Sequence, residues 1–136
     1  MHVNGSCHCG YIKFEAEVDP ESVSICHCTD CQTLTGTAYR VSVRSHENAF
    51  KLLSGQPKTY LKTAESGNQR AQAFCPECGT PLYATTVGKP GAYGIRVGTL
   101  DERRQLQPRE QGWCRSALAW VMNLESLPQT EKQIRR

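Results

Sequence analysis

Apolar and polar residues alternate in short segments along most of the chain, and this alternation predicts β-strands. Between residues 12 and 18 the apolar positions are Ile12, Phe14, Ala16 and Val18, with charged residues between them. A period of two places the apolar side chains on one face of a strand and the charged ones on the other. We expect further strands at residues 22–25, 39–43, 50–53, 59–62, 70–74, 82–87 and 93–97.

Turn-forming residues separate the expected strands. Residues 54–57, Ser-Gly-Gln-Pro, predict a hairpin between the strands at 50–53 and 59–62. One helical turn is expected from Thr29 to Thr35, and Gly36 ends it. Residues 113–122 fit either a strand or a short helix. The pattern therefore predicts a mainly β single domain over residues 1–126, followed by a polar C-terminal tail at residues 127–136.

Composition narrows the classes of protein. The chain has 136 residues, 38% of them hydrophobic and few of them aromatic, so its core is thin and a metal would help to stabilise it. The net charge is +3 and the basic residues are scattered, which argues against a nucleic-acid partner. We find no signal-peptide pattern near residue 1, and the apolar run at 117–122 is too short to span a membrane. We therefore expect a cytoplasmic protein whose eight cysteines serve metal binding or catalysis rather than disulfides.

The spacing of the cysteines is the strongest signal in the chain. A Cys75-x-x-Cys78 turn brings two thiolates onto one metal, and the glycine after it permits a tight backbone turn. Cys7 and Cys9 supply the second pair, because residues two apart in an extended segment point the same way. His8 then points away from the metal. Four thiolates predict a closed, structural zinc site.

Three further cysteines, Cys26, Cys28 and Cys31, predict a second zinc site. Cys26 and Cys28 point to one side of an extended segment, His27 points to the other, and Cys31 turns back onto the same metal. Three protein ligands leave a position open to water or substrate, which is typical of a catalytic zinc. The other pairing, of the Cys75 turn with this trio, would leave the first two cysteines without partners.

Other interpretations of the same pattern stay open. The cysteines could form disulfides, or iron could replace zinc, because tetrahedral thiolates hold both metals. Two closed sites are also possible, with His27, His8 or Cys114 as the eighth ligand. We expect isolated Cys114 to act as a small buried hydrophobe, His27 and His46 to lie at the surface, and Trp113 and Trp120 to lie in the core.

Several motifs together resemble the glutathione-dependent formaldehyde-activating enzymes, relatives of centromere protein V. The resemblance covers about residues 4 to 121, and two of its later parts are Gly98-Thr99-Leu100-Asp101 and the segment from Trp113 to Trp120. Its specific motifs are Gly-Ser-Cys-His-Cys-Gly at residues 5–10, Cys-His-Cys-Thr-Asp-Cys at 26–31 and Phe-Cys-Pro-Glu-Cys-Gly-Thr at 74–80.

The resemblance implies a zinc-organised β-tent fold and the same division of the cysteines: a structural zinc on Cys7, Cys9, Cys75 and Cys78, and a reactive one on Cys26, Cys28 and Cys31. It also implies a carbon–sulfur lyase reaction that joins glutathione and formaldehyde, or cleaves their adduct. Gln32 and Thr33 stand where many members of the family carry basic residues, and Gln111 stands where a histidine is common. These departures concern the substrate more than the fold.

The chemistry of a three-thiolate zinc suits a sulfur substrate, because a coordinated thiol loses its proton. Glutathione also carries carboxylates, which guanidinium groups bind well. The alternative to an enzyme is a non-enzymatic zinc module that binds a protein or nucleic acid. The basic residues that could bind a substrate carboxylate are Arg40, Arg44, Lys62, Arg70, Arg96 and Arg115.

Overall fold

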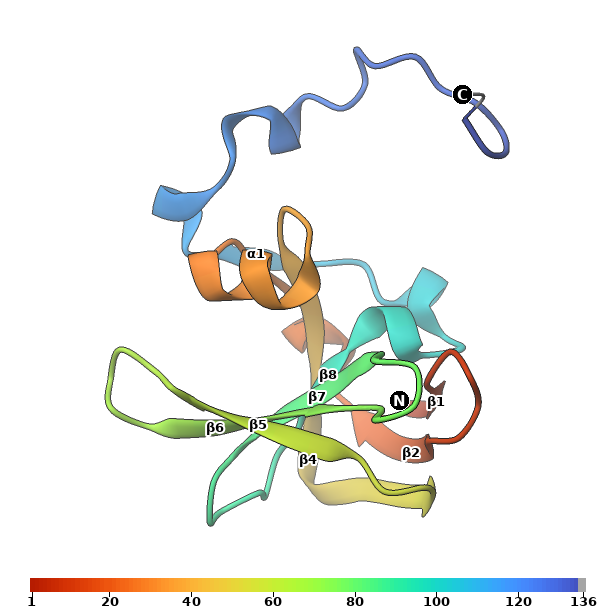
Figure 1. The fold of residues 1–136 in the computed structure, drawn as a ribbon, viewed down its shortest axis with the longest axis vertical. Helices are drawn as coiled ribbons and strands as arrows, with labels where there is room; N and C mark the ends of the chain where they lie inside the picture. Colours follow the sequence, from red (N-terminus) through yellow and green to blue (C-terminus); the bar gives the residue numbers. More distant parts are fainter. Residues whose placement is uncertain (135–136) are drawn as a thin grey trace.

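The longest strand, β4 (Arg40–Ser54), links the two halves of the β-structure in the computed structural model, which describes residues 1–134. The C-terminal part of β4 pairs antiparallel with β2 (Lys13–Val18), and β2 pairs with β1 (His2–Ser6). The β2–β4 register shifts within this pairing, and Asn48 has a φ of +56°. This irregularity lets the single strand β4 pair with strands in both halves of the sheet (Figure 1).

The N-terminal part of β4 belongs to the second half of the sheet. It pairs antiparallel with β8 (Gly94–Arg96), and the order continues through β7 (Pro81–Thr86), β6 (Gln69–Phe74) and β5 (Lys58–Thr63). Every one of these contacts is antiparallel, and Figure 1 shows these strands layered beneath α1. The prediction of a mainly β fold is therefore confirmed.

Strand β3 (Ser24–Cys26) brings the central cysteines to this sheet. It pairs antiparallel with β4 and parallel with β9 (Glu110–Gly112), so a segment far along the chain lies beside the first of these cysteines. Helix α1 (Thr29–Thr35) follows, with Cys28 as its N-cap, and it ends at Gly36 with a φ of +69°, as predicted. Short 3₁₀ turns complete the structure at Pro20–Ser22, Val97–Thr99, Arg103–Gln105, Cys114–Ser116 and Ala119–Met122.

The core confirms the pattern of β2. The alternating apolar side chains Phe14, Ala16 and Val18 of β2, and Ile12 just before it, are buried together with Leu82 and Ile95 of β7 and β8. Phe14 stacks on Phe50 with ring centroids 5.1 Å apart, and Phe50 stacks in turn on Tyr93 at 4.2 Å. The apolar face predicted from the sequence therefore forms the centre of the molecule.

One prediction about the elements is wrong, and two strands were not predicted. The hairpin across residues 54–57 does not form: the end of β4 pairs with β2, whereas β5 pairs with β6. In this arrangement the apolar face of β2 is buried against Phe50, and this burial stabilises the fold more than the local turn would. Strands β1 and β9 were not expected, because neither segment alternates strongly.

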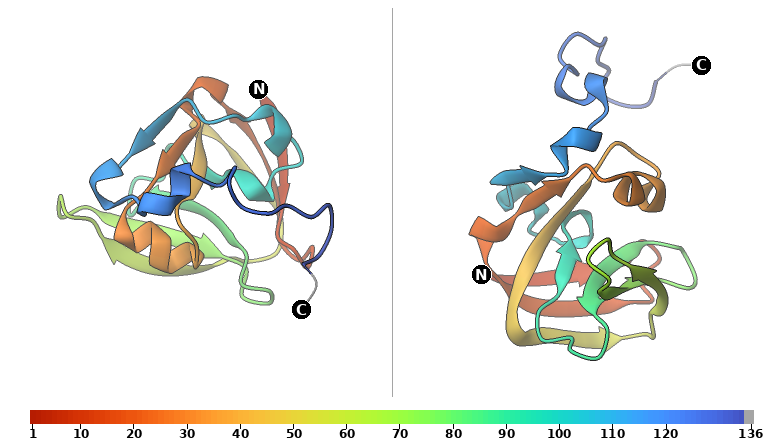
Figure 2. Two further views of the ribbon diagram at one scale, coloured as in Figure 1. Left: turned by 90° about the horizontal axis from the view of Figure 1, so that it is seen from above. Right: turned by 90° about the vertical axis from the view of Figure 1, so that its left-hand side faces the viewer.

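The segment after β9 extends away from the sheet, beyond α1 (Figures 1 and 2). The ambiguous residues 113–122 form two 3₁₀ turns rather than a strand. Trp113 and Trp120 are 47% and 57% exposed, so the prediction that they lie in the core is wrong. In the described part of the chain, no helix is both long enough and apolar enough to cross a membrane.

Candidate metal centres and an adjoining cationic pocket

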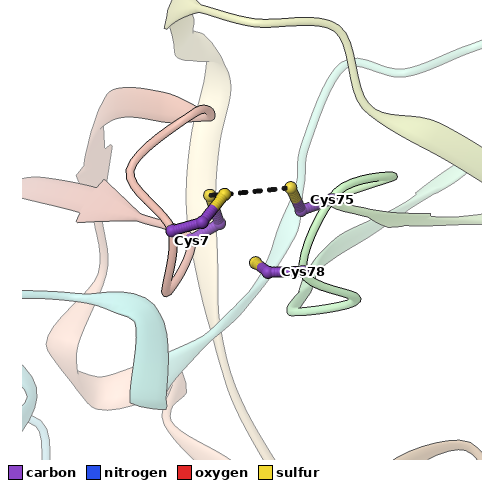
Figure 3. Close-up of side chains that lie close together, drawn as sticks. Cys7, Cys75 and Cys78 are labelled. Atoms are coloured by element: carbon purple, nitrogen blue, oxygen red, sulfur yellow. Dashed lines mark hydrogen bonds between the residues drawn. The ribbon is translucent and has the colours of Figure 1, made fainter.

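Cys7, Cys9, Cys75 and Cys78 form one cluster between the start of the chain and the β6–β7 turn. Their sulfur atoms all lie within 4.8 Å of one another, with 3.6 Å between Cys7 and Cys9 and 3.8 Å between Cys9 and Cys75. Figure 3 shows the labelled sulfurs turned toward a common centre. Tetrahedral zinc with Zn–S bonds of about 2.3 Å separates its sulfurs by about 3.8 Å, so the spacing fits the ion.

Two similar turns present these sulfurs. Gly10 and Gly79 both have φ near +80°, at 83° and 80°, and their N–H groups donate to the carbonyls of Cys7 and Cys75. A glycine meets this conformation without strain, as the sequence predicted. The expectation that Cys7 and Cys9 lie in an extended segment is wrong, because a tight turn after β1 brings their sulfurs together. His8 is exposed and does not join the cluster.

The thiols of this cluster do not ionise independently. Hydrogen bonds from Thr80 lower the pKa of Cys78 to about 5. For Cys9, the hydrogen bond from the backbone of Tyr11 favours the thiolate, but desolvation and the neighbouring thiols outweigh it and raise the pKa to about 12. A divalent cation would keep all four sulfurs ionised, since a metal-bound thiol is deprotonated. The donor set therefore fits zinc.

Cys26, Cys28 and Cys31 form the second cluster, and their sulfurs also lie within 4.8 Å of one another. Cys26 ends β3, Cys28 caps α1, and Cys31 lies in the first turn of that helix. The backbone N–H of Cys31 donates to the sulfur of Cys28 at 3.2 Å. Desolvation and the neighbouring thiols raise the pKa of Cys31 to about 12. Among residues 1–134, no histidine, carboxylate or further cysteine joins this trio.

His27 points away from the trio, as predicted, but into the interior. It is 1% exposed, so the expectation of a surface position is wrong. Its Nε2 lies 2.8 Å from Oε1 of Gln111, and its ring packs edge-on against Tyr39. The parallel β3–β9 pairing contributes to this position, because β9 lies beside β3 and brings Gln111 to the imidazole. That pairing could not be read from the local sequence.

Two of the three positions that depart from the resemblance, Gln32 and Gln111, contact this histidine. Nε2 of Gln32 donates to the carbonyls of His27 and Ser116 at 2.9 and 3.0 Å. Gln111 binds the imidazole from the other side of the fold. The two glutamines therefore tie α1, the central cysteine segment and the segment after β9 together.

A pocket of about 260 Å³ opens beside the trio. The sulfur-bearing residues Cys26 and Cys31 line it, together with four of the six basic residues named from the sequence. These four come from β4, β5, β6 and β8. They are Arg40, Lys62, Arg70 and Arg96.

The remaining candidate residues lie elsewhere. Arg44 lines a larger cavity of about 690 Å³, which shares Ser24, Ser42 and Arg70 with this pocket. His46 is exposed, as expected, although it lies in β4 rather than in a loop. Arg115 is exposed as well. Cys114 is exposed rather than buried, so its interpretation as a small core residue is wrong.

The fold and the two clusters define a class: a small, mainly β protein with two groups of cysteines that could bind metal, consistent with zinc. The family model described as "Glutathione-dependent formaldehyde-activating enzyme" matches residues 2–116, and the chain belongs to this family. The resemblance deduced from the motifs is therefore confirmed.

A solved structure shows the same fold. The chain is similar to a crystal structure of a Rhodobacter sphaeroides protein, with a TM-score of 0.61 and 21% sequence identity. The match covers 82% of this chain and 99% of the other. At this identity the likeness concerns the fold alone.

Proposed function

We propose that the chain is a zinc-dependent carbon–sulfur lyase that forms or cleaves the adduct of glutathione and formaldehyde. In this proposal Cys7, Cys9, Cys75 and Cys78 hold a structural zinc, and Cys26, Cys28 and Cys31 hold a catalytic one. The family supports the reaction class, and the two cysteine clusters support the metal.

The observation that carries the proposal is the difference between the two clusters. The first has four thiols, enough to close a tetrahedral site, whereas the trio has three and lines a pocket. A zinc ion on the trio would supply the positive charge that keeps a bound glutathione thiol ionised. A free thiol is only a few per cent thiolate at neutral pH, so this ionisation supplies a nucleophile for an aldehyde.

The chain's own groups would hold this arrangement in place. The backbone N–H of Cys31 orients the sulfur of Cys28, and the two carbonyl contacts of Gln32 fix the start of α1 against the segment after β9. Cys26 ends a strand, Cys31 lies in a helix, and Cys28 lies in the short connection between them, so regular backbone on both sides positions the three sulfurs.

Exchange NMR at equilibrium tests the reaction. The zinc-loaded protein should speed the exchange between formaldehyde, glutathione and their hydroxymethyl adduct beyond the spontaneous rate. The excess should vanish in Cys28→Ser, which removes one ligand of the trio. No excess rate from fully metallated protein would contradict the lyase assignment and favour the alternative, a non-enzymatic zinc module that binds a macromolecule.

The proposal also places the protein in the cytoplasm and the end of its folded domain at residue 126. In residues 1–134 all eight cysteines are free thiols, which suits the reducing cytoplasm. In the proposal the domain spans residues 1–126 and residues 127–136 are a polar tail; residues 135 and 136 lie outside the described part of the chain.

A further inference from the structure

A second pocket, with an apolar lining, lies next to the pocket of the trio. Its volume is about 310 Å³, and α1, β5, β6 and β7 contribute to it. The apolar side chains in its lining are Leu34, Tyr60, Phe74 and Pro81. Leu34 and Tyr60 are 37% and 56% exposed, so they face solvent rather than the core. Exposed apolar side chains that line a pocket beside a reactive site indicate a ligand that covers them.

This apolar pocket adjoins the pocket of the trio. The residues that line both are Leu34, Arg40, Gln72 and Arg96. Oε1 of Gln72 accepts hydrogen bonds from both arginines, at 3.0 and 2.6 Å, which ties the shared floor together. Leu34 comes three residues after Cys31 in α1, and residues three apart lie on the same side of a helix. The apolar pocket therefore begins about 4.5 Å along α1 from a cysteine of the trio.

The sheet divides the surface below α1 into a basic part and an apolar part. Arg70, Gln72 and Phe74 lie two residues apart along β6. Of the two pockets, Arg70 lines only that of the trio and Phe74 only the apolar one, whereas Gln72 lines both. Lys62 and Tyr60 of β5, which pair with Arg70 and Gln72, repeat this division. A ligand that reaches the trio therefore has the apolar part on one side of it.

Neither reactant of the proposed reaction has a group that fits the apolar pocket. Formaldehyde carries only hydrogen on its carbonyl carbon, and glutathione is polar apart from short methylene segments. In the adduct the sulfur is bonded to the former carbonyl carbon. A substituent on that carbon therefore starts beside the trio, within reach of the apolar pocket.

We infer that the chain accepts aldehydes larger than formaldehyde, whose unbranched apolar substituent of several carbons lies in the apolar pocket. The inference rests on the proposed function and changes only its aldehyde. The bonds that form and break stay the same. The thiolate sulfur bonds to the carbonyl carbon, the carbonyl π bond breaks, and the oxygen takes a proton from water to become a hydroxyl, which replaces the proton that the thiol released.

S-Alkylglutathiones test this inference, because they are stable analogues of the adduct in which a methylene replaces the carbon that bears the hydroxyl. Isothermal titration calorimetry on the zinc-loaded protein should show affinity rising from S-methyl through S-propyl to S-pentylglutathione. We expect a gain of about two- to fourfold for each methylene that enters the pocket, since burial of a methylene contributes this factor. Equal affinities for the three analogues would overturn the inference.

Two neighbouring residues of β5 provide a substitution and its matched control. Tyr60 lines the apolar pocket, whereas Leu61 is equally exposed, at 55%, and points to the opposite face of the strand. Tyr60→Thr should reduce the preference for S-pentylglutathione and leave the binding of S-methylglutathione unchanged. Leu61→Thr should keep the full preference. Equal preference in the two variants would contradict the assignment of the pocket. So would a change in oligomeric state in Tyr60→Thr with the preference intact, because the pocket would then be an interface between copies of the chain.

Exchange NMR separates this inference from the lyase proposal. For each aldehyde, the rate with protein is divided by the spontaneous rate, and this acceleration should be larger for pentanal than for formaldehyde in the wild type but not in Tyr60→Thr. Acceleration of formaldehyde exchange without a preference for longer chains would support the lyase and overturn the inference. A preference for longer S-alkylglutathiones without acceleration for any aldehyde would support the pocket and contradict the lyase.

Pentan-1-ol tests the pocket without a thiol or an aldehyde, and it decides the matter if no glutathione derivative binds. It should shift backbone NMR signals of α1 and β5 in the wild type and in Leu61→Thr, and less so in Tyr60→Thr. The absence of these shifts, with no binding of S-pentylglutathione, would overturn the inference.

Discussion

At the scale of single residues, the two cysteine clusters differ in what they connect. Cys9 and Cys75 are 66 residues apart, so a metal there joins the start of the chain to the β6–β7 turn. Cys28 and Cys31 are three residues apart on one local segment. A cross-link between distant residues constrains the unfolded chain far more than one between neighbours.

Serine substitutions should therefore act differently in the two clusters. Structural zinc contributes about 10–16 kcal/mol of apparent binding energy, which is as large as the net stability of a domain. We expect Cys75→Ser to give unfolded or insoluble protein, whereas Cys28→Ser stays folded with one zinc fewer. Thermal melts and metal analysis would decide this.

Cys114→Ala is the matched control for these substitutions. Cys114 is exposed and belongs to neither cluster, so this variant should keep both zinc ions and the thermal midpoint of the wild type. Loss of one zinc in this variant would make Cys114 the fourth ligand of the trio. Equal collapse of Cys28→Ser and Cys75→Ser would instead indicate two structural sites.

The buried histidine gives a second prediction at this scale. Gln111→Ala would leave Nε2 of His27 without its partner in the interior, which costs about 1–3 kcal/mol. Chemical denaturation should show this loss, and Gln107→Ala, at an exposed position, should not. A stability of Gln111→Ala equal to that of the control would mean that water replaces the amide.

At the scale of elements, the sequence pattern correctly predicted the features that depend only on neighbouring residues. The alternation of β2, the helical turn of α1 and the glycines after two of the cysteine pairs follow from the properties of neighbouring residues. The pairing of β4 with β2 and of β9 with β3 depends on which distant surfaces bury each other. No short segment of sequence contains that information, so the hairpin and the position of His27 were predicted wrongly.

Close packing between β1 and β2 leads to a prediction about these strands. Gly5 lies opposite Phe14, and a Cβ atom at Gly5 would collide with the aromatic ring. Gly5→Ala should destabilise the fold by about 1–3 kcal/mol, because the fully buried ring has no free space to move into.

The control for this prediction is Gly98→Ala. No heavy atom lies within 4 Å of a Cβ built there, and the backbone of Gly98 is not left-handed. Denaturant titrations of the two variants should separate clearly. Equal stability would show that the β1–β2 contact is looser than the packing indicates.

At the scale of the whole molecule, the sheet assembles a pocket that the sequence could not reveal. The spacing of the cysteines predicted both sulfur clusters, because the cysteines of each cluster come in short motifs. Arg40, Lys62, Arg70 and Arg96 have no such motif, since each comes from a different strand. Only the order of the strands shows which four of the six basic candidates face the trio.

The end of the chain provides a prediction about the whole fold. Residues 127–134 are all exposed, and the family match ends at residue 116. A chain that stops after residue 126 should keep the zinc content and thermal midpoint of the full chain. A lower midpoint, measured by circular dichroism, would show that the tail stabilises the domain.

The proposed open coordination position of a metal on the trio can be tested directly. In cobalt-substituted protein, glutathione should add sulfur-to-metal charge-transfer absorption and saturate at one thiol per chain, because one ligand position is free beside Cys26, Cys28 and Cys31. The change should be absent in Cys28→Ser protein that retains cobalt at the four-cysteine cluster alone. A wild-type spectrum that glutathione leaves unchanged would contradict the proposed catalytic site.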